Sequence, residues 1–189
     1  MTNAPAFMTA ASFSTDPEEA AADLGQQLSG IDLKTVIFFC SAEYDLPLLA
    51  QSLNKVFQHI DLSGCTTAGE ITPFGYGQGC ITAIGFSSTD FAIHTQSIEC
   101  LDNFSLTDAQ TLVDQLIAGC RELDVAPIKG NTFALTLLDG LSIQEENVLV
   151  TLNSALGSIP NFGGSAADDI HHYKTHVFYN GEFHTDAAV

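Results

Sequence analysis

The feature that most constrains the fold is a set of four clear helix starts, separated by runs typical of β-strands. At the first start, Asp16 precedes Pro17 and the acidic pair Glu18-Glu19, which suits a helix N-terminus with its unpaired N–H groups and positive partial charge. At the last, Ser142 and Glu145 have the spacing of a capping box. Apolar residues then recur at helical spacing in each segment. The pattern predicts helices over residues 17–28, 46–57, 106–120 and 143–156.

The intervening runs are rich in Val, Ile, Phe and Thr and are bounded by Gly, Asp or Asn, as strands usually are. Asn180-Gly181 suits a type I′ hairpin turn. We therefore expect an α+β fold, with mixed, largely antiparallel sheets covered by about four helices. The expected strands are residues 35–40, 60–63, 80–86, 91–98, 131–138 and 175–179, and the chain closes with an apolar run over 182–189. Because that run has no polar tail, we expect the natural chain to continue.

Two segments resemble each other, residues 35–70 and 131–169, and we interpret them as degenerate copies of one β-α-β-loop unit. Each unit ends in a loop of glycines, small residues and hydroxyls. Such a loop can gather backbone N–H groups around a small anion or carboxylate, or it can let strand ends pack closely at a sheet junction. Neither copy has the lysine of a P-loop, which argues against phosphate. The candidate loop residues are Gly64, Thr66, Thr67, Gly69, Gly163, Gly164 and Ser165.

Charge excludes several classes of partner. The chain has 5 Lys and Arg against 23 Asp and Glu, a formal net charge of −18. Without a basic stripe we expect no nucleic-acid partner and no binding to an anionic membrane. The five evenly spaced cysteines never form C-x-x-C, so we expect buried thiols rather than disulfides or zinc, and a cytoplasmic protein.

A hydrolase is the weakest of the functional hypotheses. Glu70, Asp168 and Asp169 are carboxylates beside turns, where general acids and bases often lie. The chain lacks Gly-x-Ser-x-Gly, and no Ser or Cys stands in a recognisable nucleophile context. We therefore expect no enzyme activity.

Histidines give a sharper signal, because four of the six lie between residues 171 and 184. Neutral imidazole is a common ligand of metals and of haem iron. With a two-residue turn, His184 faces Val177 across the hairpin, and His176 points to the other face. A three-residue loop would instead bring His176 and His184 together on one face. The sequence leaves both registers open, along with the alternative that these are ordinary strand and loop histidines.

The Gly loops, together with residues 36–44 and the closing 175–181, resemble the N-terminal half of the FIST sensory domain, over nearly the whole chain from Ala11. The resemblance implies one bacterial ligand-sensing domain over residues 1–189, lacking the C-terminal half that such chains usually carry. It also implies signal transduction and a small ligand, with amino acids among the proposals.

The His-rich end resembles the NosP-type branch, which implies haem b and nitric oxide sensing. The branch also implies a histidine kinase, or a cyclic-di-GMP synthase or phosphodiesterase, as partner. The residues we assign to haem are the axial candidates His184 and His176, then His172, with Phe178 and Phe183 framing the ring and Lys174 near a propionate. Nitric oxide bound opposite the histidine would weaken the iron–histidine bond and release its strand. The alternative is a haem-free domain that holds an amino acid or small carboxylate at the Gly loops. Homodimer formation is left open.

Overall fold

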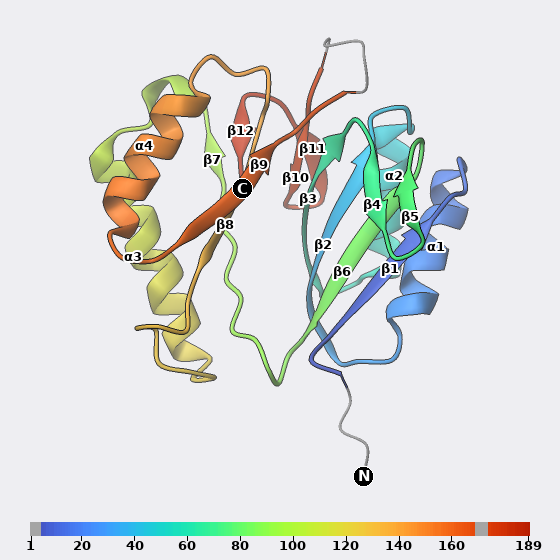
Figure 1. The fold of residues 1–189 in the computed structure, drawn as a ribbon, viewed down its shortest axis with the longest axis horizontal. Coiled ribbons are helices and arrows are strands. Elements are labelled where there is room, and N and C mark those ends of the chain that lie inside the picture. Colours follow the sequence, from blue (N-terminus) through green and yellow to red (C-terminus); the bar gives the residue numbers. More distant parts are fainter. Residues whose placement is uncertain (1–4, 169–173) are drawn as a thin grey trace.

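Four layers make up the molecule in this computed structural model, which describes residues 5–168 and 174–189 (Figure 1). Two helices cover the outer face of a six-stranded sheet, and two more cover the outer face of a four-stranded sheet. The inner faces of the two sheets look toward each other. We call the six-stranded half the first lobe and the four-stranded half the second lobe.

The first lobe contains a sheet in the order β1-β6-β2-β3-β10-β11, in which only β2 and β3 are parallel neighbours. Helices α1 and α2 pack on it around a core that includes Leu24, Leu49 and Phe38. The Asp16 carboxylate caps α1 by accepting bonds of 2.9 Å from the N–H groups of Glu18 and Glu19. The elements are β1 (Phe7–Ser12), α1 (Pro17–Leu28), β2 (Leu33–Ser41), α2 (Leu46–Val56), β3 (Asp61–Thr67), the two-stranded flap of β4 (Glu70–Thr72) and β5 (Gly75–Gly77), β6 (Ile81–Ser87), β10 (Val177–Tyr179) and β11 (Glu182–His184).

The second lobe contains a shorter sheet in the order β7-β12-β8-β9, with β8 and β9 parallel. Strands β7 and β12 have only two residues each, whereas α3 has 17 residues and so spans about 25 Å. The C-terminal part of α3 therefore runs past the end of the sheet (Figure 1). The elements are β7 (Ile98–Glu99), a short 3-10 helix (Leu101–Asn103), α3 (Leu106–Glu122), β8 (Ala134–Leu138), α4 (Glu145–Leu156), β9 (Asn161–Ser165) and β12 (Ala187–Ala188).

The expected fold class is confirmed: the sheets are mixed and largely antiparallel, and four helices cover them. Both β-α-β units are present, as β2-α2-β3 and β8-α4-β9, each with its two strands parallel. No helix in residues 5–168 and 174–189 is long and apolar enough to cross a membrane.

Two local predictions are wrong. Residues 91–98 do not form a strand, since only Ile98 belongs to β7, and β7 pairs with only the two residues of β12. The capping box at Ser142 does not form either. Helix α4 begins at Glu145, because the Ser142 hydroxyl instead accepts a bond from the Gln144 N–H and approaches Asp186.

Candidate functional site

The β10–β11 hairpin has the two-residue turn. Val177 pairs with His184 and Phe178 with Phe183, and the turn residues Asn180 and Gly181 have φ values of 50° and 84°. His176 directly precedes Val177, so the two histidines belong to opposite faces of the hairpin. The register that would bring both imidazoles together is therefore not adopted.

His184 shares a face of the hairpin with Val177 and Tyr179, whose side chains pack in a cluster with Leu137 and Ala187 of the second lobe. Its ring stacks on Tyr179, with ring centres 4.0 Å apart and planes 19° from parallel. Its Nε2 is buried and has no hydrogen-bond partner among the residues that the structure describes. Burial, and then the hydrogen bond to Glu99, raise the pKa of Tyr179 to about 12.

His176 lies on the other face, edge-on to Phe183 with ring centres 6.3 Å apart. Its backbone N–H donates to the Thr66 hydroxyl at 3.0 Å. Burial lowers the pKa of His176, and Lys174 lowers it further, while the carboxylates of Asp139 and Asp168 act in the opposite direction. Its Nδ1 is buried without a hydrogen-bond partner within the described chain.

Phe178 and Phe183 do not frame a hollow at the hairpin. Their rings pack edge-on against Phe38, with ring centres 5.0 Å and 6.1 Å away, in the core under α1 and α2. Lys174 is exposed, and His172, with His171 and Asp169, lies outside the described residues. In this conformation the aromatic side chains around the histidines do not fit a porphyrin.

The two Gly loops lie side by side, because the Ala167 N–H donates to the Thr66 carbonyl at 2.9 Å. Gly64 and Gly163 permit close backbone contact: a Cβ there would meet the carbonyl oxygens of Phe38 at 2.4 Å and Thr136 at 1.9 Å. These two glycines are therefore explained by packing of parallel strands.

The remaining loop residues make varied contacts. Thr67 donates to Glu70, and the Ser165 hydroxyl donates to Glu145. A Cβ on Gly69 would meet the Tyr76 hydroxyl at 2.1 Å, whereas one on Gly164 would meet open space. Most of the loop polar groups thus already have partners inside the protein.

Of the three carboxylates named for hydrolysis, Glu70 and Asp168 are buried, and Asp169 lies outside the described residues. Glu70 accepts bonds from the Thr67 hydroxyl at 2.6 Å and the Cys80 thiol at 3.1 Å. Asp168 accepts from the Lys174 N–H at 2.9 Å. These contacts make both side chains part of the internal hydrogen bonding where the loops meet.

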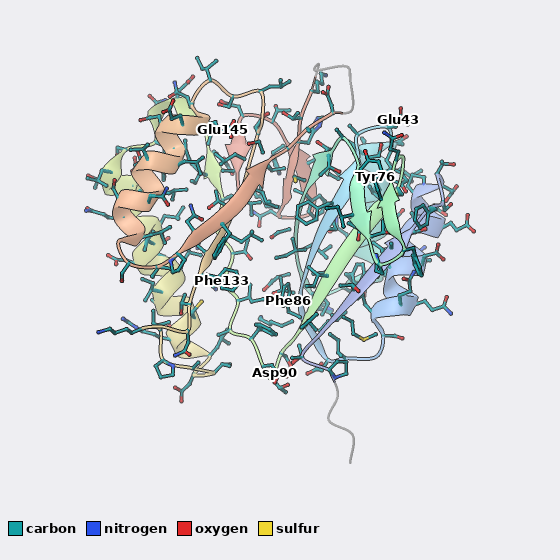
Figure 2. The ribbon with its side chains drawn as sticks, in the orientation of Figure 1. Glu43, Tyr76, Phe86, Asp90, Phe133 and Glu145 are labelled. Carbon is teal, nitrogen blue, oxygen red and sulfur yellow. The ribbon has the colours of Figure 1, made fainter. Side chains whose placement is uncertain are left out.

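A cavity of about 380 Å³ lies between the lobes, and we call it the inter-sheet cavity. The first lobe contributes Ile37 of β2 and Phe86 of β6, and the second contributes Phe133 and Leu135 at β8. Phe86 and Phe133 lie on the two sides of the space between the sheets (Figure 2). Most of the side chains in the wall are apolar.

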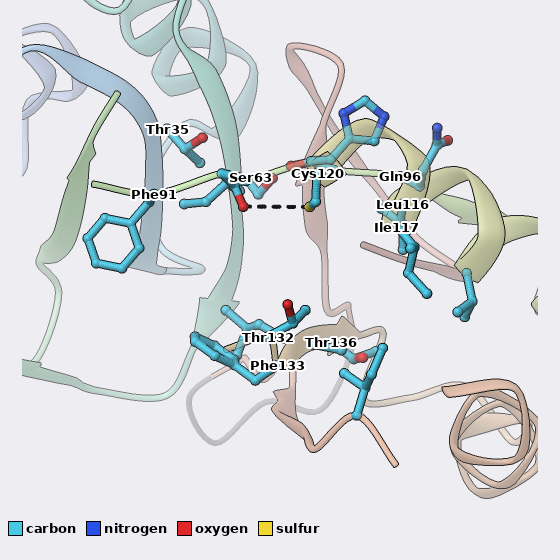
Figure 3. A pocket seen from close by; sticks show the side chains of 18 of the residues that line it. Thr35, Ser63, Phe91, Gln96, Leu116, Ile117, Cys120, Thr132, Phe133 and Thr136 are labelled. Carbon is cyan, nitrogen blue, oxygen red and sulfur yellow. Dashed lines mark hydrogen bonds between the residues drawn. The ribbon is translucent and has the colours of Figure 1, made fainter. Parts of the chain in front are cut away.

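The cavity exists because the second sheet is short. Beyond the two residues of β7, the apolar face of α3 has no strand to cover it, and Leu116, Ile117 and Cys120 line the cavity instead (Figure 3). Residues 91–96, which have no regular structure, also line the cavity and belong to the segment that links β6 to β7. The Cys120 thiol contacts the Ala92 carbonyl at 3.6 Å, which attaches this segment to α3.

A second, polar cleft of about 290 Å³ lies beside the hairpin turn. We call it the polar cleft. Its wall is formed by the end of α2, the start of β3, residues 94–97 and the turn at residues 179–181. His94, Thr95 and Gln96 belong to the walls of both cavities.

Sequence reasoning missed both cavities and His94. One signal was available, since helix 106–120 has an apolar face that continues to Cys120 and must be covered by something. The residues proposed for haem, His176, His184, Phe178 and Phe183, are absent from the walls of both cavities. Their assignment remains a prediction.

The family model described as FIST N domain matches residues 34–189. No curated protein and no solved structure matches the chain.

Proposed function

The chain belongs to the FIST N domain family, a family of sensory domains, and on that premise we propose that it senses a small apolar molecule held in the inter-sheet cavity. The observation that carries the proposal is the cavity itself. About 380 Å³ of space with a largely apolar wall is the usual setting for a small-molecule site.

The position of the cavity suits a sensor. Its wall includes Ile37 from the first lobe, Ile117 from the second, and residues 91–96 of the segment that crosses between them. A ligand bound there contacts all three at once. It would favour whichever arrangement of the lobes gives it the most contact, and a partner protein can read that arrangement.

Nile red, an uncharged apolar dye, tests the site directly. We expect the wild-type protein to bind it with enhanced fluorescence, and Ile117→Trp to lose this binding because the indole takes up cavity space that the dye needs. Val150→Trp is the matched control, since Val150 is an exposed residue of the neighbouring helix α4 and does not line the cavity. Circular dichroism establishes that both variants are folded. Equal dye binding by a folded Ile117→Trp would contradict the proposal.

A second proposal is a haem-based nitric oxide sensor, with the haem at the hairpin and not in the inter-sheet cavity. It is supported by the resemblance of the His-rich end and by the buried Nε2 of His184, which has no hydrogen-bond partner within residues 5–168 and 174–189. The packing of Phe178 and Phe183 in the core is unfavourable for a haem at the hairpin in this conformation. Addition of haem should produce an intense Soret band that His184→Ala, or else His176→Ala, alters. A protein that stays colourless would remove haem from the proposal.

The amino-acid alternative has less support. Gly64 and Gly163 each pack against the backbone of a neighbouring strand, and the Thr67 hydroxyl is already bonded to Glu70. Thermal shifts with a panel of amino acids test it, and a reproducible increase in melting temperature would favour it over an apolar ligand.

We propose a histidine kinase or a cyclic-di-GMP synthase or phosphodiesterase as the partner, and a non-catalytic role for this domain. The support is membership of a family of sensory domains, together with the resemblance of this chain's His-rich end to a signalling branch of that family. A two-hybrid screen against these enzymes of the source organism tests the partner. Contact with none of them would contradict it.

A further inference from the structure

The inter-sheet cavity and the polar cleft share a wall, and this arrangement says what kind of molecule the domain can hold. Three consecutive residues, His94, Thr95 and Gln96, line both spaces. One space is largely apolar, whereas the other is lined mainly by hydroxyl, amide and backbone groups. From these contacts we infer that the ligand is an amphiphile with an uncharged polar head. Its apolar chain lies between the sheets and its head lies in the cleft. This inference rests on the proposed function.

The shared segment is held in place from the α3 side. The His94 ring lies directly on Gly119, where a Cβ would come within 2.6 Å of the imidazole Cγ. The Cys120 thiol contacts the Ala92 carbonyl at 3.6 Å. These contacts hold the backbone of residues 92–94 next to α3. The two residues that follow, Thr95 and Gln96, therefore lie where they can line both spaces.

Some polar groups of the cleft are already paired. Asn54 donates to the Gly181 carbonyl at 2.8 Å, and Tyr179 bonds to Glu99. Asp61 lies 3.5 Å from the ammonium group of Lys34. These contacts build the cleft, and they place a cation beside Asp61, the one carboxylate that lines the cleft among the residues that the structure describes.

Other polar groups are free to bind a ligand. The side chains of Thr95, Gln96 and Asn180 form no hydrogen bond with any residue in the described part of the chain. A hydroxyl and two amides both donate and accept, and none carries charge. They match a head group with hydroxyls or amides.

Charge argues against an anionic head. The chain has a formal net charge of −18, and although Lys34 offsets the Asp61 carboxylate in the cleft wall, Glu99 lies nearby on Tyr179. A carboxylate or phosphate head would be repelled by this field. An uncharged head group avoids this repulsion and can still form hydrogen bonds with the side-chain amides of Gln96 and Asn180.

Three probes with the same ten-carbon acyl chain test the inference: monodecanoyl glycerol, methyl decanoate and decanoate, below their micelle concentrations. Calorimetry measures their affinities. We expect monodecanoyl glycerol to bind about tenfold more tightly than the other two, the discrimination that about two neutral hydrogen bonds supply. Gln96→Ala should remove most of this preference and leave methyl decanoate unchanged. Gln110→Ala, an exposed glutamine of α3 outside both cavities, should keep it.

The outcomes separate this inference from the proposed function. Equal binding of all three probes, unaffected by Gln96→Ala but lost in Ile117→Trp, would overturn the amphiphile and leave an apolar site. Tightest binding of decanoate would overturn the uncharged head. If no probe binds and Nile red is also not bound, the proposed function itself fails.

Discussion

At the scale of single residues, burial decides the chemistry of the acids, thiols and histidines. Glu70 is 1% exposed, and its oxygens accept bonds from Thr67 and Cys80. A buried carboxylate is tolerated when it is hydrogen-bonded in this way. The same desolvation, together with Glu70, raises the pKa of Cys80 to about 12.

The thiols should differ sharply in reactivity. Cys100 is exposed, whereas Cys40, Cys65 and Cys80 are buried. Burial raises the pKa of Cys65 to about 12, so at pH 8 its thiolate fraction is about one part in ten thousand. We expect iodoacetamide to label Cys100 in the native protein and to leave the three buried thiols unmodified, as mass spectrometry can show.

Unfolding in urea provides the control for this labelling, since all five thiols should then react. Native labelling of Cys80 as fast as Cys100 would contradict the prediction. The expectation of five buried thiols was wrong at Cys100, which follows β7 at φ 57° and is exposed.

His176 should make stability depend on pH. Burial holds its folded pKa below the ordinary value of 6.5, so the unfolded chain binds the proton more readily. The neutral ring therefore contributes its full stabilisation above pH 6.5, and this contribution falls as the pH drops toward the folded pKa. We expect the melting temperature of His176→Phe to fall less between pH 7.5 and pH 5.5 than the melting temperature of the wild type. An equal loss in both proteins would contradict this role.

At the scale of elements, the β10–β11 hairpin joins the two lobes. Strand β10 pairs with β3 of the first sheet, and the chain then continues from β11 to β12 of the second. Its turn depends on two residues with positive φ, Asn180 and Gly181. The turn therefore positions both His184 and the wall of the polar cleft.

Gly181→Ala should destabilise the protein by about 1–2 kcal/mol, because φ at Gly181 is 84° and alanine rarely adopts that conformation. The new Cβ would also lie 3.0 Å from the Asn54 amide nitrogen. Urea unfolding measures the change. Asn180→Gly is the control, since glycine accepts φ 50° without strain. Two variants as stable as wild type would show that the turn does not limit stability.

At the scale of the whole molecule, two facts stand out: the sheets enclose a cavity, and the surface is strongly acidic. The cavity follows from the unequal lengths of α3 and the strands beside it. The charge of −18 falls on a chain with five Lys and Arg residues, so like charges repel across the surface.

Salt should therefore stabilise the protein. Raising NaCl from about 20 to 300 mM shortens the screening length severalfold, and a gain of about 1 kcal/mol would raise the melting temperature by about 2–4 °C. Calorimetry measures the shift. A double variant of exposed acids, Asp114→Asn with Glu122→Gln, should show a smaller salt effect. A melting temperature independent of salt would contradict the argument.

Local signals in the sequence determined the helices and the hairpin. Caps such as Asp16, apolar spacing and the Asn180-Gly181 turn act within a few residues, so their effects can be read along the chain. The β-α-β pattern also follows from local order. Where the prediction was wrong, at residues 91–98, residues that favour strands were available, but β7 pairs only through Ile98 and Glu99.

Only the tertiary structure decided where a ligand can bind. The cavity wall joins Ile37, His94 and Leu135, and the hairpin faces are set by pairing Val177 with Cys65, more than a hundred residues apart in the chain. Such neighbours depend on which strands pair and how far each sheet extends. Periodicity in the sequence shows which face of a helix or strand is apolar, but it does not show which element packs against that face. For that physical reason the sequence indicated the histidines as the ligand site, whereas the inter-sheet cavity lies beside α3.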